Sequence, residues 1–167
     1  VVRLDPGLAF GTGTHPTTRM CLRWIAGQAR AQPTGAIAER VLDYGCGSGI
    51  LAIGAAKLGA IDVDAVDIDP AALDSAVQNA QANGVMIRTG MPELARGAYE
   101  LVLANILASP LKVLAPLLCG HVADGGELVL AGILDRQEQE LIEAYAPYCQ
   151  LTVADREDGW ILMTASR

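Results

Sequence analysis

The sequence has few of the residues that mark several familiar classes of protein. Aromatic residues make up 4% and charged residues 19% of its 167 positions, and the formal net charge is −7. Because affinity for nucleic acid depends on Lys and Arg, this charge argues against a nucleic-acid partner. No apolar run reaches the roughly 18 residues that a membrane-spanning helix requires, so we also expect no membrane partner.

Cysteine and histidine are too few and too scattered to suggest a metal site. The four cysteines form no CxxC pair, and the two histidines lie far apart in the sequence. We therefore expect no metal and four free thiols without a partner that would activate them, in a reducing cytoplasm. The chain opens with Val1 instead of Met, so we expect it to be a piece of a longer protein. Nothing in the sequence indicates an oligomeric state.

The residues that are present favour a folded α/β domain. Apolar residues make up 51% of the chain, enough for a sizeable core. Strand and helix signals alternate after residue 40, which predicts a doubly wound, mostly parallel sheet. A terminal hairpin at 149–165, turning at Asp158-Gly159, would make the last strand of seven antiparallel. The other strands are expected at 40–45, 61–69, 85–89, 99–106 and 125–134.

Helices are expected at 17–30, 48–59, 70–84, 110–122 and 135–146. Pro116 should bend or break the fourth of these, because proline cannot donate to the helical hydrogen-bond ladder. In the helix that begins at Pro70, apolar positions three and four residues apart predict one buried stripe. Its members are Leu73, Ala76, Val77 and Ala80.

A glycine-rich loop follows the first predicted strand. Asp43 precedes glycines at positions 45, 47 and 49. Glycine allows a sharp turn and the close approach of a ligand, and nucleotides bind at this end of parallel strands. The spacing is GxGxG and not the GxGxxG of dinucleotide-binding proteins, because Ile50 stands at the last position. A tight turn with no ligand is the alternative interpretation.

Two polar residues follow neighbouring predicted strands. Asp67 lies where a ribose hydroxyl would need an acceptor, although a solvated strand end, with Asp69 capping the next helix, is the alternative. The amide oxygen of Asn105, after the fourth strand, could accept a hydrogen bond from an amine. Asn105 could equally cap a helix beginning near Ser109-Pro110. No aromatic residue follows Asn105 to stack a flipped base, which argues again against a nucleic-acid substrate.

The pattern D-x-G-x-G-x-G, followed by an acid after the second strand, resembles S-adenosylmethionine-dependent methyltransferases of the seven-stranded class. Three segments together resemble one family, the ribosomal-protein methyltransferases that trimethylate amino groups of large-subunit ribosomal protein eleven (PrmA family). These segments are "DPGLAFGTGTHPTT" at 5–18, "VLDYGCGSGILAIGAAKLGA" at 41–60 and "ANILASPL" at 104–111. The resemblance spans the whole chain.

The resemblance implies an S-adenosylmethionine cofactor and methyl transfer to lysine ε-amino or N-terminal α-amino groups of a ribosomal protein. It implies cofactor contacts from Thr18, Asp43, Gly45, Gly47, Asp67 and Asn105. Asn105 would hold the methionine end, the acceptor amine or both, and would be the catalytic residue. Family members also carry an N-terminal domain that recognises the substrate, which we expect to be absent from this chain. Another amine substrate, a nicotinamide-dependent oxidoreductase and a non-catalytic binding module are the alternatives.

The segment before residue 18 is expected to form a lid over the same site. Gly7, Gly11 and Gly13 would let the lid approach a ligand closely. Phe10 and His15 would line the entrance for the acceptor, and Thr14 or Thr17 would cap the following helix. We thus expect one structural domain, 1–167, with the lid and first helix at 1–38 and the methyltransferase core at 39–167.

Overall fold

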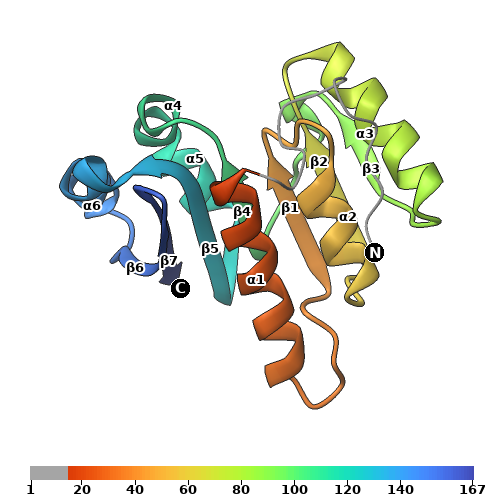
Figure 1. The fold of residues 1–167 in the computed structure, drawn as a ribbon, viewed down its shortest axis with the longest axis horizontal. Coiled ribbons are helices and arrows are strands. Elements are labelled where there is room, and N and C mark those ends of the chain that lie inside the picture. Colours follow the sequence, from red (N-terminus) through yellow and green to blue (C-terminus); the bar gives the residue numbers. More distant parts are fainter. Residues whose placement is uncertain (1–14) are drawn as a thin grey trace.

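The computed structural model describes residues 15–167 as a seven-stranded sheet between two layers of helices (Figure 1). The strand order is β3-β2-β1-β4-β5-β7-β6. Strands β1 to β5 pair in parallel, whereas β7 is antiparallel to both β5 and β6. The predicted α/β fold, a doubly wound sheet with a reversed last strand, is therefore confirmed.

The elements alternate along the chain as the sequence predicts. The strands are β1 (Arg40–Tyr44), β2 (Asp62–Val66), β3 (Arg88–Gly90), β4 (Tyr99–Asn105), β5 (Val122–Leu134), β6 (Thr152–Glu157) and β7 (Trp160–Ser166). The α-helices are α1 (Pro16–Ala31), α2 (Ile50–Lys57), α3 (Pro70–Ala82), α4 (Ala108–Val113), α5 (Ala115–Gly120) and α6 (Glu138–Tyr145). Two 3-10 turns, η1 (Pro92–Leu94) and η2 (Asp135–Gln137), complete the chain.

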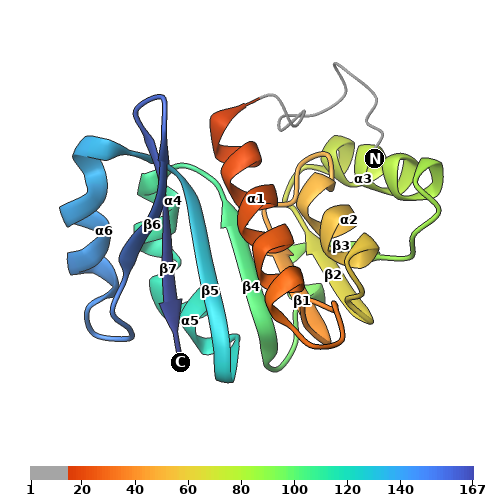
Figure 2. The same cartoon turned by 60° about the horizontal axis from the view of Figure 1, so that its bottom comes forward.

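Each face of the sheet buries its own apolar core. Helices α1, α2 and α3 cover one face, and α4, α5 and α6 cover the other (Figure 2). Side chains alternate between the two faces of a strand, so neighbouring residues of β4 serve different cores. Leu101 and Leu103 pack with Met20 and Ile25 of α1, whereas Val102 packs with the helices of the opposite face.

Several expected boundaries differ from those in the structure. The predicted helix at 110–122 is broken near Pro116 as expected, but Val122 already begins β5. The predicted strand at 85–89 is wrong at its start, because β3 begins at Arg88. In α3, Val77 is 39% exposed instead of buried. The buried face of this helix is turned toward Ser75 and Asn79, so two polar side chains outside the predicted apolar stripe are buried while Val77 is not.

Among the described residues, no helix is both long enough and apolar enough to cross a membrane. Residues 15–167 also contain no cluster of three or more side chains with metal-ligand chemistry. Most of the predicted lid before residue 18, including Phe10, lies outside the described residues, and so does the capping role considered for Thr14. The described end of this segment, from Pro16 on, is the first turn of α1.

Candidate functional site

The glycine loop turns the chain from β1 into α2 over five residues. Gly45, Gly47 and Gly49 all have positive φ angles, of 76°, 55° and 81°, a region that side chains with a Cβ rarely adopt. The amides of Gly45 and Cys46 both donate to the carbonyl of Val66, at 2.8 and 2.9 Å, which ties the loop to the end of β2. The glycines predicted from the spacing therefore have a conformational requirement, independent of any ligand.

Asp67, the residue after β2, joins the glycine loop to the end of that strand. Its Oδ2 accepts from the amide of Gly47 at 2.9 Å, and its Oδ1 accepts from the amide of Asp69 at 3.0 Å. A carboxylate offers about four acceptor positions, so these two bonds leave capacity for further donors. The side chain is only partly buried. It therefore combines a fixed orientation with free lone pairs, which suits a ligand that carries two neighbouring hydroxyl groups.

Asp69 has the structural role predicted for it. Its side chain accepts from the amide of Ala71 at 3.0 Å and caps α3, whose first residue is Pro70. The cap satisfies one of the amides that the first turn of a helix leaves without an intrahelical acceptor. The two acids thus have different roles: Asp69 caps α3, whereas Asp67 accepts a hydrogen bond from the glycine loop.

Asp43 lies beneath the loop and is 1% exposed. Its Oδ2 accepts from the amide of Ala52 in α2 at 3.1 Å. Burial raises the pKa of Asp43 to about 7, the hydrogen bond from Ala52 opposes this rise, and the charge of Asp67 adds to it. The contact in the structure joins β1 to α2, so a direct contact between Asp43 and a ligand stays a prediction.

Asn105 and Thr18 meet across the site, although 87 positions separate them in the sequence. The Nδ2 of Asn105 donates to the hydroxyl of Thr18 at 3.5 Å. Thr18 is fully buried on α1, and Asn105 is the last, partly exposed residue of β4. The alternative role of Asn105 as a helix cap is wrong, because Leu107 holds the N-cap position of α4. Donation through Nδ2 orients the amide and leaves its oxygen as an acceptor.

Gly132 positions the loop after Asn105 and was not identified from the sequence. It has a φ of +88° at a register shift in β5. A Cβ on Gly132 would lie 2.1 Å from the carbonyl oxygen of Ile106, and one on Gly45 would lie 2.6 Å from the Cγ2 of Ile106. Ile106 is therefore packed between the two glycines, which fixes Asn105 relative to the glycine loop. An isolated glycine inside a predicted strand was the available signal.

Asn79 supports the glycine loop from α3, and sequence reasoning also missed it. Its Nδ2 donates to the carbonyl of Ser48 at 2.9 Å, and the side chain is 2% exposed. Asn79 lay outside the predicted apolar stripe and its burial depends on tertiary packing, so no sequence signal pointed to this role.

His15 begins α1 and replaces Thr17 as its capping residue. Its Nδ1 accepts from the amide of Thr17 at 3.3 Å and lies 2.8 Å from the hydroxyl of Thr17. Its ring packs edge-on against Trp160, with the ring centroids 5.1 Å apart. The predicted cap by Thr17 is therefore wrong. The expected place of His15 at the entrance for an acceptor stays a prediction.

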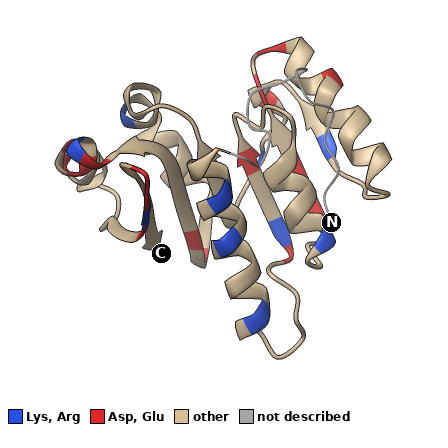
Figure 3. Ribbon diagram, in the orientation of Figure 1, with Lys and Arg blue, Asp and Glu red and all other residues tan. Residues whose placement is uncertain are grey.

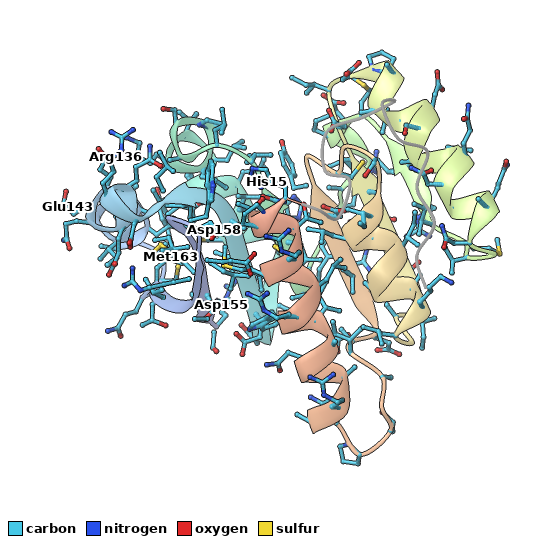
Figure 4. All side chains as sticks on the ribbon, in the orientation of Figure 1. His15, Arg136, Glu143, Asp155, Asp158 and Met163 are labelled. Carbon is cyan, nitrogen blue, oxygen red and sulfur yellow. The ribbon has the colours of Figure 1, made fainter. Side chains whose placement is uncertain are left out.

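Ion pairs fasten α1, which carries Thr18, to the terminal hairpin. Figure 3 shows basic positions along α1 and acidic positions on the hairpin, and Figure 4 shows His15 at the start of α1 near Asp158. Arg19 pairs with Glu157, and Arg23 bridges Asp155 at 2.8 Å and Glu157 at 2.6 Å. The two arginines hold the pKa of Glu157 below its usual value. The hairpin thus helps to fix the wall of the site that α1 provides.

Two of the four thiols are not isolated, contrary to the expectation from the sequence. The sulfur atoms of Cys119 and Cys149 lie 3.8 Å apart, whereas Cys21 and Cys46 are buried. Sequence spacing could not show the pairing, because it depends on how α5 and the segment after α6 pack together.

Comparison with known proteins identifies the family. The sequence model of "Ribosomal protein L11 methyltransferase (PrmA)" matches residues 1–167. A ribosomal protein L11 methyltransferase from Polaromonas sp. strain JS666 is 71% identical over 165 residues, which are 99% of this chain and 54% of that protein. One from Bordetella parapertussis is 54% identical over 163 residues, which are 97% of this chain and 51% of that protein. The chain spans about half the length of the curated relatives it matches.

Solved structures agree with this result. The crystal structure of a ribosomal protein L11 methylase from Lactobacillus delbrueckii subsp. bulgaricus superimposes with a TM-score of 0.86 at 37% identity. The match covers 99% of this chain and 84% of that one. A T. thermophilus 16S rRNA methyltransferase, solved with AdoMet and guanosine, gives a TM-score of 0.75 at 21% identity. It covers 95% of this chain and 45% of that one, and it supports the fold alone.

Proposed function

The chain belongs to the ribosomal protein L11 methyltransferase (PrmA) family, and from this premise we propose that it binds S-adenosylmethionine and transfers methyl groups to amino groups of a ribosomal protein. The acceptors are lysine ε-amino groups, an N-terminal α-amino group or both. The reaction is placed in the cytoplasm, where ribosomal proteins are made. The remaining half of the relatives' length is assigned the recognition of this substrate.

The observation that carries the proposal is the position of the Asp67 carboxylate beside the glycine loop. Its carboxylate is oriented by the amides of Gly47 and Asp69 and keeps free acceptor positions at the carboxyl end of β2. Adjacent ribose hydroxyls would bind there, and the backbone of Gly45 and Gly47 would line the methionine part of the cofactor. The donors and acceptors present fit S-adenosylmethionine without a metal ligand.

The bound cofactor would supply an electrophilic methyl group on a sulfonium. The protein's task is then to hold a neutral amine in line with that methyl group, since only the neutral nitrogen has a lone pair to donate. A lysine amine has an ordinary pKa of about 10.4, so the site must favour loss of its proton through partial burial and a nearby positive charge.

Asn105 would orient one amino group in the site. Its Nδ2 is engaged by Thr18, so its Oδ1 is the atom left to accept an amino N–H. That amino group is either the acceptor or the α-amino group of the cofactor. Asn105→Ala separates the two roles: a weaker Kd for the cofactor indicates the second, and a lower kcat at unchanged Kd indicates the first.

Calorimetry with S-adenosylmethionine tests the site. We expect the unmodified chain to bind and Asp67→Ala to weaken binding by at least about tenfold, because ribose hydroxyls lose a charged acceptor worth roughly 1.5–3 kcal/mol. Asp74→Ala is the matched control, since Asp74 is an exposed acid on α3. Absence of binding by the unmodified chain, or equal binding by Asp67→Ala, would refute the assignment of the site.

A methyl-transfer assay tests the substrate. The chain and a full-length relative would each be incubated with radiolabelled S-adenosylmethionine and ribosomal protein L11. We expect the full-length relative to label the protein, and the chain to label it more slowly if substrate recognition resides in the remaining half. A chain that binds the cofactor but labels an unrelated amine in preference to the ribosomal protein would contradict the proposed substrate. A parallel titration with NADH should show no binding.

A further inference from the structure

Cys119 and Cys149 form a dithiol that the proposed methyl transfer does not use. Cys119 lies near the end of α5, and Cys149 lies between α6 and β6. Their sulfur atoms are 3.8 Å apart, and both side chains are partly exposed. A disulfide bond has an S–S distance of about 2.05 Å, so the two atoms need to approach by less than 2 Å (about 1.8 Å) to bond.

The surroundings make the two thiols unequal. The contact between the two thiols lowers the pKa of Cys149 and raises that of Cys119. The thiolate is the nucleophilic form of cysteine. In contrast, burial raises the pKa of Cys21 and of Cys46. Cys149 and Cys119 are both partly exposed, but Arg167 lowers the pKa of Cys119 by less than the contact with Cys149 raises it, so only the pKa of Cys149 is lowered on balance.

A cavity of about 320 Å³ opens beside the pair. Both cysteines line it, together with Tyr148, which is 51% exposed, and Arg167. The guanidinium of Arg167 donates to the carbonyl of Val122 at 2.7 Å and lies 3.4 Å from the exposed carboxylate of Asp124, so a partly compensated positive charge lies at the cavity. The volume falls at the lower end of the range for small-molecule sites, about 300–1,000 Å³. A small disulfide with carboxylate groups therefore has both room and a complementary charge.

We propose that Cys149 and Cys119 are a site of thiol–disulfide exchange with small-molecule disulfides, in which Cys149 attacks and Cys119 resolves. The Cys149 thiolate attacks one sulfur of the disulfide RSSR and releases the first thiolate RS⁻. The Cys119 thiolate then attacks the sulfur of Cys149 and releases the second RS⁻. The two cysteines are oxidised to one intrachain disulfide, RSSR is reduced to two RSH, and the two thiol protons pass to the released thiolates.

The dithiol lies away from the glycine loop along the strands. Cys119 precedes the amino end of β5, whereas the glycine loop and Asn105 follow the carboxyl ends of β1 and β4, which run parallel to β5. The bond would join α5 to the segment after α6, two segments that are 30 positions apart in the sequence. We therefore expect oxidation to stabilise this side of the sheet and to leave the affinity for S-adenosylmethionine unchanged.

Oxidised glutathione is the probe for the exchange. The native chain would be incubated with it, and the products analysed by mass spectrometry and peptide mapping. We expect the loss of two hydrogen atoms, a bond between Cys119 and Cys149, and two remaining free thiols, those of Cys21 and Cys46. Tm should rise by roughly 5 °C, since closing a loop of this length restricts the unfolded chain. No disulfide, or a disulfide that involves Cys21 or Cys46, would overturn the proposal.

A variant and a labelling experiment test the assigned order of attack. In Cys119→Ser the reaction should stop at one glutathione attached to Cys149. In the native chain, brief treatment with iodoacetamide should label Cys149 before Cys119, because in the intact pair the pKa of Cys149 is lowered and that of Cys119 is raised. Equal labelling of the two cysteines, or the reverse order, would show that Cys149 is not the attacking thiol. Unchanged calorimetric binding of S-adenosylmethionine after oxidation is expected, and a loss of binding would refute the separation of the two sites.

Discussion

Replacing Asp43 by Asn should remove most of the pH dependence that this buried acid gives to folding. Asp43 lies beneath the glycine loop and is only 1% exposed, and this burial raises the pKa of its carboxyl group from 3.8 to about 7. Below about pH 3 the folded and unfolded chains both hold the proton, so the group has no pH-dependent effect. As the pH rises toward 7, the unfolded chain loses the proton before the folded chain does, and stability falls.

The magnitude follows from the two pKa values. A difference of about three pKa units corresponds to a full penalty of about 4 kcal/mol above pH 7, of which about 2.5 kcal/mol develops between pH 5 and pH 8. The asparagine keeps an oxygen that can accept from the amide of Ala52. Its buried NH₂ group adds a cost of about 1–3 kcal/mol that does not depend on pH.

Urea denaturation at pH 5, 6, 7 and 8 measures the effect. The free energy of unfolding of Asp43→Asn minus that of the unmodified chain should rise by about 2.5 kcal/mol across this range. Asp74→Asn, which removes an exposed carboxylate of α3, is the matched control and should show no such rise. A difference for Asp43→Asn that stays constant within about 0.5 kcal/mol from pH 5 to pH 8 would refute the reasoning.

Three further substitutions probe the framework of the site, each by urea denaturation. Gly132→Ala should destabilise by about 2–4 kcal/mol, because residue 132 has a positive φ and the added Cβ would clash with the backbone of Ile106. Gly27→Ala is the control: its added Cβ would meet no atom within 4 Å, so it should be neutral or stabilise by up to about 1 kcal/mol. Tyr99→Phe should cost about 1–3 kcal/mol, because its hydroxyl donates to buried Asp64 at 2.6 Å; a cost near zero would contradict this role. Asn79→Ala should cost about 1–3 kcal/mol and also weaken S-adenosylmethionine binding, and an unchanged affinity would argue against its support of the loop.

The order of elements was predictable because local signals determine it. Strand–helix alternation, the break near Pro116 and the cap by Asp69 each depend on neighbouring residues. The start of β5 was not predictable in the same way. Val122 was expected to end a helix, but it pairs with Tyr99 of β4, and such pairing depends on a partner far away in the sequence.

The residues of the candidate site also fall into two groups, those that the sequence predicts and those that only the folded structure reveals. The spacing of the glycine loop and the positions of Asp67 and Asn105 could be read from the chain, and the family resemblance added Thr18. Gly132 and Asn79 could not be identified, because their roles depend on contacts with Ile106 and Ser48 that only the folded chain brings together. The residues proposed to contact the cofactor follow local motifs, whereas the residues that position them depend on tertiary contacts.

The ion pairs between α1 and the hairpin also have a consequence for the order of folding. Arg19 and Arg23 pair with acidic residues of β6 that lie 132 to 138 positions further along the chain, so α1 is held in place by a strand that is distant in the sequence. Contacts of such long range close large loops and therefore form slowly. During synthesis on the ribosome, α1 has to wait for the hairpin to emerge before these pairs can form. The contact between Thr18 and Asn105 would then be held in place only after β6 has emerged.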